Sequence, residues 1–330
     1  MAARPAAVGD GAWSVGLDVG GTKVLGVLVD GAGAVVETLR LPTRHGAEGV
    51  VGSAAEVVQG LCAAAGLAPR DLVGVGAGVP GLVDPLTGRV SHAVNLGIHD
   101  GVPLGPMLGG RLGGVPVSVE NDLNAAAVGA AHVLGVRGDL AFLALGTGVA
   151  AGLVLDGRLR RGHRGGAGEV GHLPYDLSGP LCPCGQRGCL ELYASGASLD
   201  AAWPSRTGRP APAEVFAAAA EGDLDAVRLR DAFAAAVAAA VRLLVLTCGV
   251  EHVVLGGGVA GVGAPLLSAV AQQLDREAQG SPFLRSLGIA DRLRLVDPQE
   301  PVAPIGAALA VRAAEDGWLP EQRARAVGTA

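Results

Sequence analysis

The segment VGLDVGGTKVLGVLVDG, residues 15–31, decides the fold, because the same order of strands and turns recurs later in the chain. Its apolar residues on both sides of Gly20-Gly21 predict two strands joined by a tight turn, and Asp30-Gly31 predicts a second turn. Residues 140–157, LAFLALGTGVAAGLVLDG, repeat that order. We therefore predict an α/β protein that contains a duplicated domain.

The segments around the two repeats alternate between patterns typical of helices and of strands. A strand at 116–119 runs into an alanine-rich helix, so Asp122 lies at a strand-to-helix junction and is expected to cap the helix. Residues 158–190 are rich in arginine and glycine, which predicts a long loop. The other predicted strands are 34–41, 72–77, 252–255 and 293–296, and the other predicted helices include 47–65, 212–220, 223–247 and 304–314.

Composition limits the classes of function. The chain has 330 residues, enough for two domains, and its net charge of −6 offers no large basic face for a nucleic acid. The first dozen residues lack the apolar core of a secretory signal, and no uninterrupted apolar run reaches membrane-spanning length. Few, clustered cysteines are typical of a reducing compartment. We expect a cytoplasmic protein that binds small molecules, with no nucleic-acid or membrane partner.

The turn DVGGTK, residues 18–23, has the groups that hold phosphate. Its glycines allow close approach of backbone N–H groups, its threonine adds a hydroxyl, and its lysine is the only one among 25 basic residues. Its aspartate is suited to water held on Mg²⁺. A plain hairpin turn is the alternative, but the matching turn in the repeat favours phosphate binding. The residues expected at the phosphates are Asp18, Gly20, Gly21, Thr22, Lys23, Gly146, Thr147 and Gly148.

The segment GGGVAG, residues 256–261, follows a predicted strand and fits the dinucleotide pattern G-x-G-x-x-G. A dinucleotide site also needs an acid at the end of the next strand, about 20 residues on. Asp275 lies inside a predicted helix, and the next strand does not end until Asp297. We therefore favour a nucleotide base and ribose over a dinucleotide. The glycines expected to carry them are Gly256, Gly257 and Gly258.

Three cysteines lie within the short segment CPCGQRGC, residues 182–189. Cys182 and Cys184 are too close in sequence for easy disulfide pairing, and an odd number of cysteines would leave one over. Three thiolates around a tight turn suit a tetrahedral zinc site, whose fourth ligand would be His172, the nearest imidazole. With Cys189 as the third thiolate, four protein ligands leave no open position, so the zinc is expected to be structural.

Glu169 and Glu191 flank this cluster in the sequence. Each can be read as a solvated surface acid. If zinc ties His172 to the three cysteines, however, the stapled loop brings the two carboxylates close together. Such a pair suits hydrogen bonds with several hydroxyl groups of one carbohydrate.

Together these motifs resemble the ROK group (repressors, open reading frames and kinases) over about residues 14–315. DVGGTK and LGTGV look like its two phosphate motifs, and ENDLNA looks like its sugar and catalytic segment. GEVGH is similar to its sugar and zinc segment, CPCGQRGCLE to its zinc signature and VVLGGGVA to its adenosine motif. The resemblance implies a duplicated actin-like ATPase (ribonuclease H-like) fold with two lobes and a central cleft. The implied lobes are residues 13–121, completed by a C-terminal helix at 303–330, and residues 122–302, with a zinc-binding loop at 165–191.

The resemblance also implies roles for the residues in these motifs. Asp122 would be the general base for the acceptor hydroxyl, and it would bind the sugar together with Asn121, Glu169, His172 and Glu191. One ring nitrogen of His172 would contact zinc and the other would contact the sugar. ATP and Mg²⁺ are the implied cofactors beside structural Zn²⁺, and a homodimer or homotetramer is implied.

The expected reaction is ATP-dependent phosphorylation of the 6-hydroxyl of a hexose, with glucose as the first candidate. Ile98 follows Asn95-Leu96-Gly97 where many glucokinases of the group have tryptophan, which keeps other substrates open. These are an amino sugar, an N-acetylhexosamine (N-acetylmannosamine or N-acetylglucosamine) and a sugar-like cyclitol. A sugar-responsive transcriptional regulator is a second alternative, but it would need a helix-turn-helix domain, and about a dozen residues precede Trp13. Polyphosphate as the donor in place of ATP also stays open.

Overall fold

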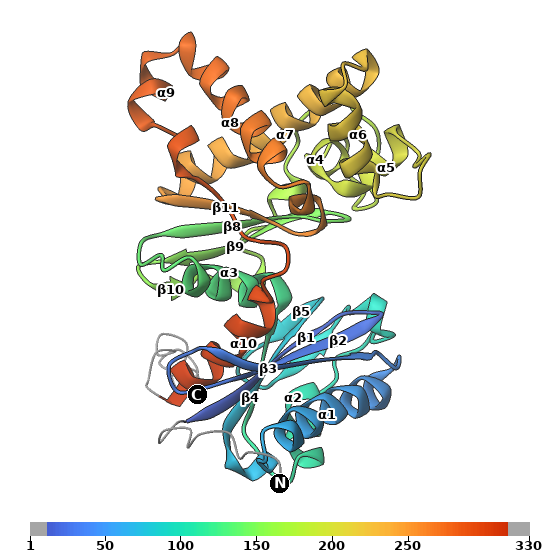
Figure 1. Cartoon of the computed structure of the whole chain (residues 1–330), viewed down its shortest axis with the longest axis vertical. Helices are drawn as coiled ribbons and strands as arrows, with labels where there is room; N and C mark the ends of the chain where they lie inside the picture. The colour runs from blue at the N-terminus through green and yellow to red at the C-terminus, as the bar shows by residue number, and fades with distance from the viewer. Residues whose placement is uncertain (1–11, 316–330) are drawn as a thin grey trace, which may run out of the picture. The chain divides into compact units, whose positions relative to one another are not determined.

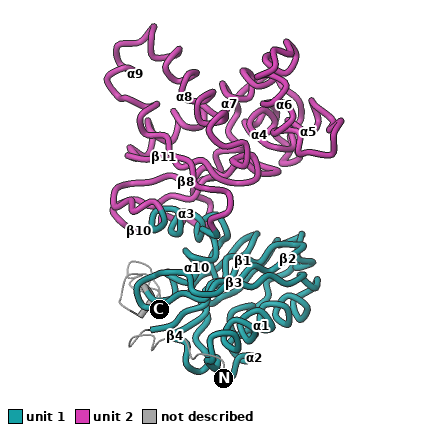
Figure 2. The backbone as a smooth tube through the Cα atoms, viewed as in Figure 1, with its two compact units in different colours: residues 1–133, 301–330 teal, residues 134–300 magenta. Residues whose placement is uncertain are grey.

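The computed structural model describes residues 12–315, and its contacts divide the chain into two compact units. The first unit contains residues 1–133 and 301–330, and the second contains residues 134–300 (Figure 2). The chain therefore leaves the first unit once and returns to it. The first eleven residues, and residues 316–330 of the C-terminal element expected from the sequence, lie outside the described residues.

The first unit is a five-stranded sheet with helices on both faces (Figure 1). Its elements are β1 (Trp13–Val19), β2 (Lys23–Val29), β3 (Val35–Pro42), α1 (Ala47–Ala64), β4 (Leu72–Val79), β5 (Leu82–Asp84), β6 (Arg89–Ser91), α2 (Leu104–Arg111), β7 (Val117–Asn121), α3 (Asp122–Val133) and α10 (Val302–Glu315). Side chains of β1 alternate between the two faces. Val15 and Leu17 join the core under α1, whereas Gly16 lies directly against the backbone of α10.

The second unit is also built on a five-stranded sheet. Its elements are β8 (Leu140–Leu145), β9 (Val149–Leu155), β10 (Arg158–Leu159), α4 (Glu191–Ala194), α5 (Gly196–Ala202), α6 (Ala211–Ala220), α7 (Leu224–Cys248), β11 (His252–Gly256), α8 (Ala264–Gln279), α9 (Pro282–Leu287) and β12 (Leu293–Leu295). α7 contacts α4, α6 and α8, and α7 and α8 contact β11 and β12 respectively. Between β10 and α4 the chain is mostly loop, as the sequence predicts.

Both sheets have the same strand order, which confirms the predicted duplication. The order is β3-β2-β1-β4-β7 in the first unit and β10-β9-β8-β11-β12 in the second. In each sheet the three meander strands pair antiparallel, and the two later strands add in parallel. In both units, the turn between the first two strands therefore lies at the end of the sheet where the parallel strands have their carboxyl ends. Ligands of α/β sheets bind at this end.

α3 and α10 pack against each other at glycine positions. A Cβ atom on Gly129 would lie 1.8 Å from the carbonyl oxygen of Val302, and one on Gly306 would lie 1.8 Å from the carbonyl oxygen of Ala125. This close approach requires glycine on both helices. It also holds α3 in the first unit, and the division between the two units falls after Val133.

α7 is the long central helix of the second unit. By length and composition it is the one helix among residues 12–315 that could cross a membrane, although the sequence shows no uninterrupted apolar run of that length. Half of the qualifying window is buried inside the unit, where Phe233, Val237 and Val241 belong to the core. Burial in a helix layer therefore accounts for the apolar character of α7.

Candidate functional site

The first turn joins β1 to β2. The N–H of Gly20 donates to the carbonyl oxygen of Lys23 at 3.0 Å, which closes the turn. A Cβ atom on Gly21 would lie 2.7 Å from the carbonyl oxygen of Asn95, so this position requires glycine. Thr22 and Lys23 are exposed. The turn thus presents a hydroxyl and an ammonium group to solvent beside a tightly packed backbone.

Two carboxyl groups interact next to this turn. Burial raises the pKa of Asp18 to about 6, with a further contribution from the negative charge of Asp122 and an opposing one from Lys23. Burial also raises the pKa of Asp122, although the N–H of Leu123, which donates to its carboxylate at 2.9 Å, lowers it in part. A carboxylate whose pKa is raised is a better proton acceptor near neutral pH. The first unit therefore combines a candidate general base with a candidate phosphate turn.

The helix cap at the β7–α3 junction is Asn121, which corrects the expectation that Asp122 caps the helix. The side-chain oxygen of Asn121 accepts from the N–H groups of Leu123 at 3.0 Å and Asn124 at 3.3 Å. Its amide nitrogen donates to the carbonyl oxygen of Gly81 at 3.3 Å. Asn121 therefore caps the helix, while the carboxylate of Asp122 accepts a hydrogen bond from the N–H of Leu123.

Glu120 is a site residue to which the sequence motif assigned no separate role. Its carboxylate is buried and accepts from the side-chain amide of Asn124 at 2.9 Å and from the N–H of Asn121 at 3.0 Å. Glu120 lies in β7 and Asn124 in α3, so no helical spacing in the sequence links them. The pair holds the strand end against the first turn of α3 and so fixes the backbone that carries Asp122.

The second turn joins β8 to β9, and it lies beside the glycine segment that follows β11. The N–H of Gly146 donates to the carbonyl oxygen of Gly148 at 3.0 Å. Gly257 has a φ of 80°, and a Cβ atom there would lie 2.6 Å from the carbonyl oxygen of Leu145. Gly258 has open space around its Cα atom. The structure therefore brings the second predicted phosphate turn and the predicted adenosine glycines together in one unit.

The predicted metal ligands form one cluster. The ligand atoms of His172, Cys182, Cys184 and Cys189 all lie within 4.8 Å of one another. The sulfur atoms of Cys184 and Cys189 are 3.6 Å apart, close to the separation of about 3.8 Å between two thiolates of a tetrahedral zinc site. The Gln186 backbone N–H lowers the pKa of the Cys184 thiol to about 7. Three sulfurs and one imidazole are a donor set that zinc prefers, so the residues fit this ion.

The loop that carries Glu169 and His172 is packed on β9 by two glycines. A Cβ atom on Gly168 would lie 1.7 Å from the carbonyl oxygen of Ala151, and one on Gly171 would lie 2.0 Å from that of Val149. Between these two contacts Val170 is buried and the side chain of Glu169 is exposed. The G-E-V-G-H sequence therefore has a structural reason for both glycines beside the proposed roles of its acid and its histidine.

Glu191 lies at the cysteine-histidine cluster itself. One carboxylate oxygen lies 3.1 Å from the sulfur of Cys182 and 3.4 Å from Nδ1 of His172. The other lies so near Gly148 that a Cβ atom on that glycine would be 2.9 Å from it. Glu191 therefore stands between the cluster and the second turn. Nδ1 of His172 faces the sulfur of Cys182 at 4.0 Å, which leaves Nε2 for another partner.

Three residues that the sequence did not single out contact the turns. Thr43 and His45 contact the first turn, and Gly196 donates its backbone N–H to the carbonyl oxygen of Gly146, in the second turn, at 2.7 Å. Each contact is a hydrogen bond to a backbone carbonyl oxygen. Backbone acceptors leave no signature in the sequence of the donor, so no motif could have found these residues.

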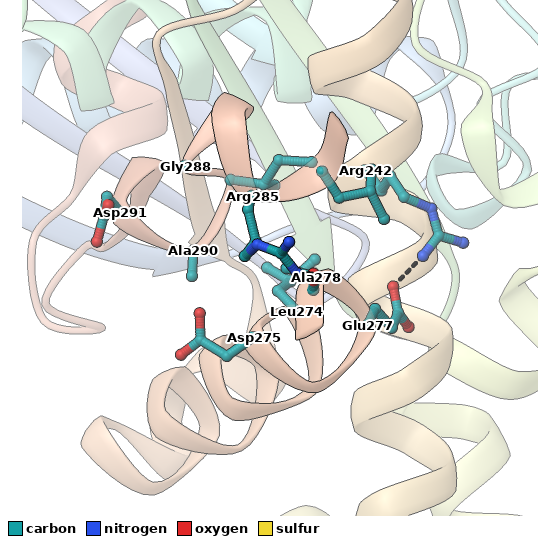
Figure 3. Close-up of a pocket in the computed structure, with 11 residues that line it drawn as sticks. Arg242, Leu274, Asp275, Glu277, Ala278, Arg285, Gly288, Ala290 and Asp291 are labelled. Carbon is teal, nitrogen blue, oxygen red and sulfur yellow. Dashed lines mark hydrogen bonds and ion pairs between the residues drawn. The ribbon is translucent and has the colours of Figure 1, made fainter. Parts of the chain in front are cut away.

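A cavity of about 160 Å³ in the second unit lies among α7, α8 and α9 (Figure 3). Leu274 and Ile289 contribute apolar surface, and Arg242 forms an ion pair with Glu277 at one end. Arg285, also at the cavity, donates to the carbonyl oxygen of Ala278 at 3.1 Å. No residue of the predicted site lines this cavity. It is therefore separate from the chemistry described above.

Comparison with known proteins agrees with this arrangement. The model of the ROK family matches residues 14–291. A glucokinase of Halalkalibacterium halodurans is 32% identical over 298 residues, which cover 82% of this chain and 89% of that protein. An N-acetylmannosamine kinase of Citrobacter koseri is 34% identical over 275 residues, which cover 80% of this chain and 89% of the relative.

A solved structure shows the same fold. The ROK family glucokinase from Streptomyces griseus, in complex with glucose and AMPPNP, superposes with a TM-score of 0.72 at 30% identity. The match covers 91% of this chain and 99% of that one. The duplicated actin-like α/β fold expected from the sequence is thereby confirmed.

Proposed function

The chain belongs to the ROK family, and from this premise we propose that it is a sugar kinase that transfers the terminal phosphoryl group of ATP to the 6-hydroxyl of a hexose. Glucose is the first candidate, because a glucokinase is among the similar proteins and a similar glucokinase binds glucose and AMPPNP. The proposed cofactors are ATP, Mg²⁺ and structural Zn²⁺.

One observation carries this proposal. Within the first unit alone, Asp122 lies close enough to Asp18 for their charges to interact, and Asp18 lies two residues before the glycine turn that leads into Lys23. The proposed general base for the acceptor hydroxyl and the proposed binding turn for the donor phosphates thus lie at the same end of the sheet. Phosphoryl transfer needs both at once, because catalysis depends on positioning and on charge stabilisation.

The proposed reaction is a direct transfer. Asp122 accepts the proton of the 6-hydroxyl as the sugar oxygen forms a bond to the γ-phosphorus, and the bond between that phosphorus and the β,γ-bridging oxygen breaks. The products are the sugar 6-phosphate and ADP, and the proton remains on Asp122 until solvent removes it. Lys23 and the N–H groups of the first turn stabilise the phosphate charges. Mg²⁺, when bound near Asp18, would neutralise charge between the β- and γ-phosphates.

The cysteine-histidine cluster is proposed to hold zinc for structure. Four protein ligands fill a tetrahedral site, so the ion would fix the loop and take no part in transfer. His172 would bind zinc through Nδ1 and a sugar hydroxyl through Nε2. Asn121, Glu169 and Glu191 are proposed as further sugar ligands.

The remaining proposals concern the whole molecule. The two units would act as the two lobes of a kinase. In the second unit, the turn at 146–148 and the glycines 256–258 are also proposed to bind nucleotide. A cytoplasmic homodimer or homotetramer without a nucleic-acid or membrane partner is proposed, and the similarity to a glucokinase and to an N-acetylmannosamine kinase supports small-molecule partners.

An N-acetylhexosamine is the second candidate substrate. The observation in its favour is the similarity to an N-acetylmannosamine kinase, which matches about as much of the chain as the glucokinase does. The same base and phosphate groups would serve either sugar, so the two candidates differ only in what surrounds the acceptor.

The test is a coupled assay with purified protein against glucose, mannose, N-acetylmannosamine, N-acetylglucosamine and inositol, with ATP or polyphosphate as donor. The expected result is ATP-dependent formation of glucose 6-phosphate, with Zn²⁺ near one per chain in the same sample. Turnover of N-acetylmannosamine alone would favour the second candidate. Turnover of none of these sugars with either donor would remove the proposal.

A further inference from the structure

The backbone of the first turn is held from outside its own hairpin. The hydroxyl of Thr43 donates to the carbonyl oxygen of Gly20 at 2.6 Å, and Nε2 of His45 lies 3.1 Å from the carbonyl oxygen of Gly21. Because a carbonyl oxygen only accepts, the imidazole must carry its proton on Nε2. The N–H of Thr43 also donates to the carbonyl oxygen of Thr22 at 3.1 Å. Three successive carbonyl groups are therefore bound by a short segment just beyond β3.

Fixing these carbonyl groups also fixes the N–H groups that follow them. In a trans peptide the C=O and the next N–H point in opposite directions, and the described residues contain no cis peptide. Thr43 therefore turns the N–H of Gly21 away from itself, and His45 does the same for the N–H of Thr22. Successive N–H groups on one side of a turn form a concave site for an anion.

These two N–H groups are left without a protein partner. Within residues 12–315, no acceptor is hydrogen-bonded to the N–H of Gly21 or Thr22. By contrast, the N–H of Gly20 is used to close the turn. A turn whose carbonyl groups are all bound, while its central N–H groups are left open, is prepared for an anionic ligand.

We propose that Thr43 and His45 are positioning residues that orient the first turn for the phosphates of the nucleotide. The inference rests on the proposed function, because it takes the phosphates of ATP as the anion. Neither side chain is proposed to touch the nucleotide or the reacting atoms. Their loss would weaken nucleotide binding by letting the peptide planes of the turn rotate, which costs the preorganisation of the N–H groups.

The variants that test this are Thr43→Val, which removes the hydroxyl and keeps the branched shape, and His45→Phe, which removes the ring donor. Thr43→Ser is the conservative variant, because it restores a hydroxyl. The protein supplies a matched control for each residue. His132 lies 3.2 Å through Nε2 from the carbonyl oxygen of Gly33, in the turn between β2 and β3, and Thr247 donates to the carbonyl oxygen of Leu243 at 2.6 Å in the second unit. The control variants are His132→Phe and Thr247→Val.

The measurements are the Kd of AMPPNP by calorimetry, the KM for ATP and for the sugar, and urea unfolding of each variant. Thr43→Val and His45→Phe are each expected to weaken AMPPNP binding about tenfold, the loss of roughly one hydrogen bond, and to raise the KM for ATP more than that for the sugar. Thr43→Ser is expected to restore binding. The controls are expected to bind AMPPNP like the wild type, even where they unfold more easily.

The outcomes separate this inference from the proposed function. If the wild type binds AMPPNP but phosphorylates no sugar, the proposed function fails while the Kd values still decide the inference. Loss of stability with an unchanged Kd in Thr43→Val and His45→Phe would overturn it in favour of a purely structural role. The inference is also overturned if the wild type does not bind AMPPNP, or if the control variants lose binding equally.

Discussion

The two turns have the same sheet around them but different supports. In the first unit, two side chains hold the turn through its carbonyl groups. In the second, the backbone N–H of Gly196 holds the carbonyl of Gly146, and this glycine follows α4, whose first residue Glu191 contacts the metal cluster. Duplication has therefore kept the strand order and changed the support. The first turn depends on side-chain donors, whereas the second depends on a segment anchored next to the thiols.

The sharpest way to test the comparison is to remove the acid that follows the last strand of each sheet. Asp122 follows β7, and Asp297 lies just beyond β12, the equivalent strand. Asp122→Asn is expected to lower kcat by about 10²–10⁴-fold, because the amide cannot take the proton from the hydroxyl. Binding of glucose and AMPPNP is expected to change little. Steady-state kinetics and calorimetry measure the two effects.

Asp297→Asn is the matched control. Asp297 is exposed, and its carboxylate accepts the N–H of Gln299 at 2.9 Å, which makes it a turn residue. We expect it to keep nearly wild-type kcat. Equal losses of kcat in the two variants would contradict the assignment of Asp122 as the general base.

Removing one thiol of the cysteine-histidine cluster is expected to affect zinc content and sugar binding in the second unit. Cys189→Ser removes a buried ligand from the set of four and is expected to lower the zinc content well below one per chain. Sugar affinity should fall as well, because the loop that carries Glu169 and His172 would lose its anchor. Zinc is measured by elemental analysis and sugar binding by calorimetry. Cys248→Ser, a change of a free thiol in the same unit, is the control.

Replacing Asp18 is expected to have a smaller effect on stability, and stability and activity are expected to change in opposite directions. Its pKa rises from 3.8 to about 6 on folding, so its contribution to stability is full below pH 3.8 and is lost as the pH rises through 6. At pH 7 the buried charge costs stability, and Asp18→Asn is expected to add about 1–3 kcal/mol to the free energy of unfolding. The same change is expected to abolish most of the Mg²⁺-dependent activity.

Urea unfolding at pH 4 and pH 7, without added Mg²⁺ or nucleotide, tests the sign. The difference in the free energy of unfolding between Asp18→Asn and the wild type should grow toward pH 7.

Glu214 in the second unit provides the contrast, because hydrogen bonds from Thr207, Arg206 and Ser205 lower its pKa to about 2. Its contribution is present above pH 4.5 and is lost as the pH falls toward 2, so Glu214→Gln should destabilise the protein at pH 7. A destabilising Asp18→Asn at pH 7 would contradict the assignment.

Much of the fold could be predicted from the sequence because its signals are local. Alternation and turn residues defined the duplicated hairpins, and three cysteines in a short segment defined the metal cluster. The short helices α2, α4, α5 and α9 were not predicted, since each has eight residues or fewer and too little periodicity to register. The packing of α3 could not be predicted locally, because it depends on glycine contacts with a helix at the far end of the chain.

The site was predicted less completely than the fold. Motifs identify residue types that carry chemistry, and Asp18, Asp122 and the four metal donors all follow from them. Which of two adjacent residues caps α3 depends on backbone geometry, and here it is Asn121. The supports of the turns depend on tertiary contacts with backbone atoms, to which the sequence gives no clue. The contacts that position the site residues therefore could not be predicted from the sequence.

The smallest expected effect distinguishes glycines kept for packing from glycines kept for a ligand. Gly258→Ala should change the free energy of unfolding by less than about 0.5 kcal/mol, because no atom within 4 Å would meet the new methyl group. If adenosine rests on this glycine, AMPPNP binding should nevertheless weaken. Gly257→Ala should instead cost about 1–3 kcal/mol, because its φ of 80° strains any other residue and Leu145 blocks the methyl group. Unchanged AMPPNP affinity in Gly258→Ala would move the adenosine away from this glycine and leave the segment with a packing role only.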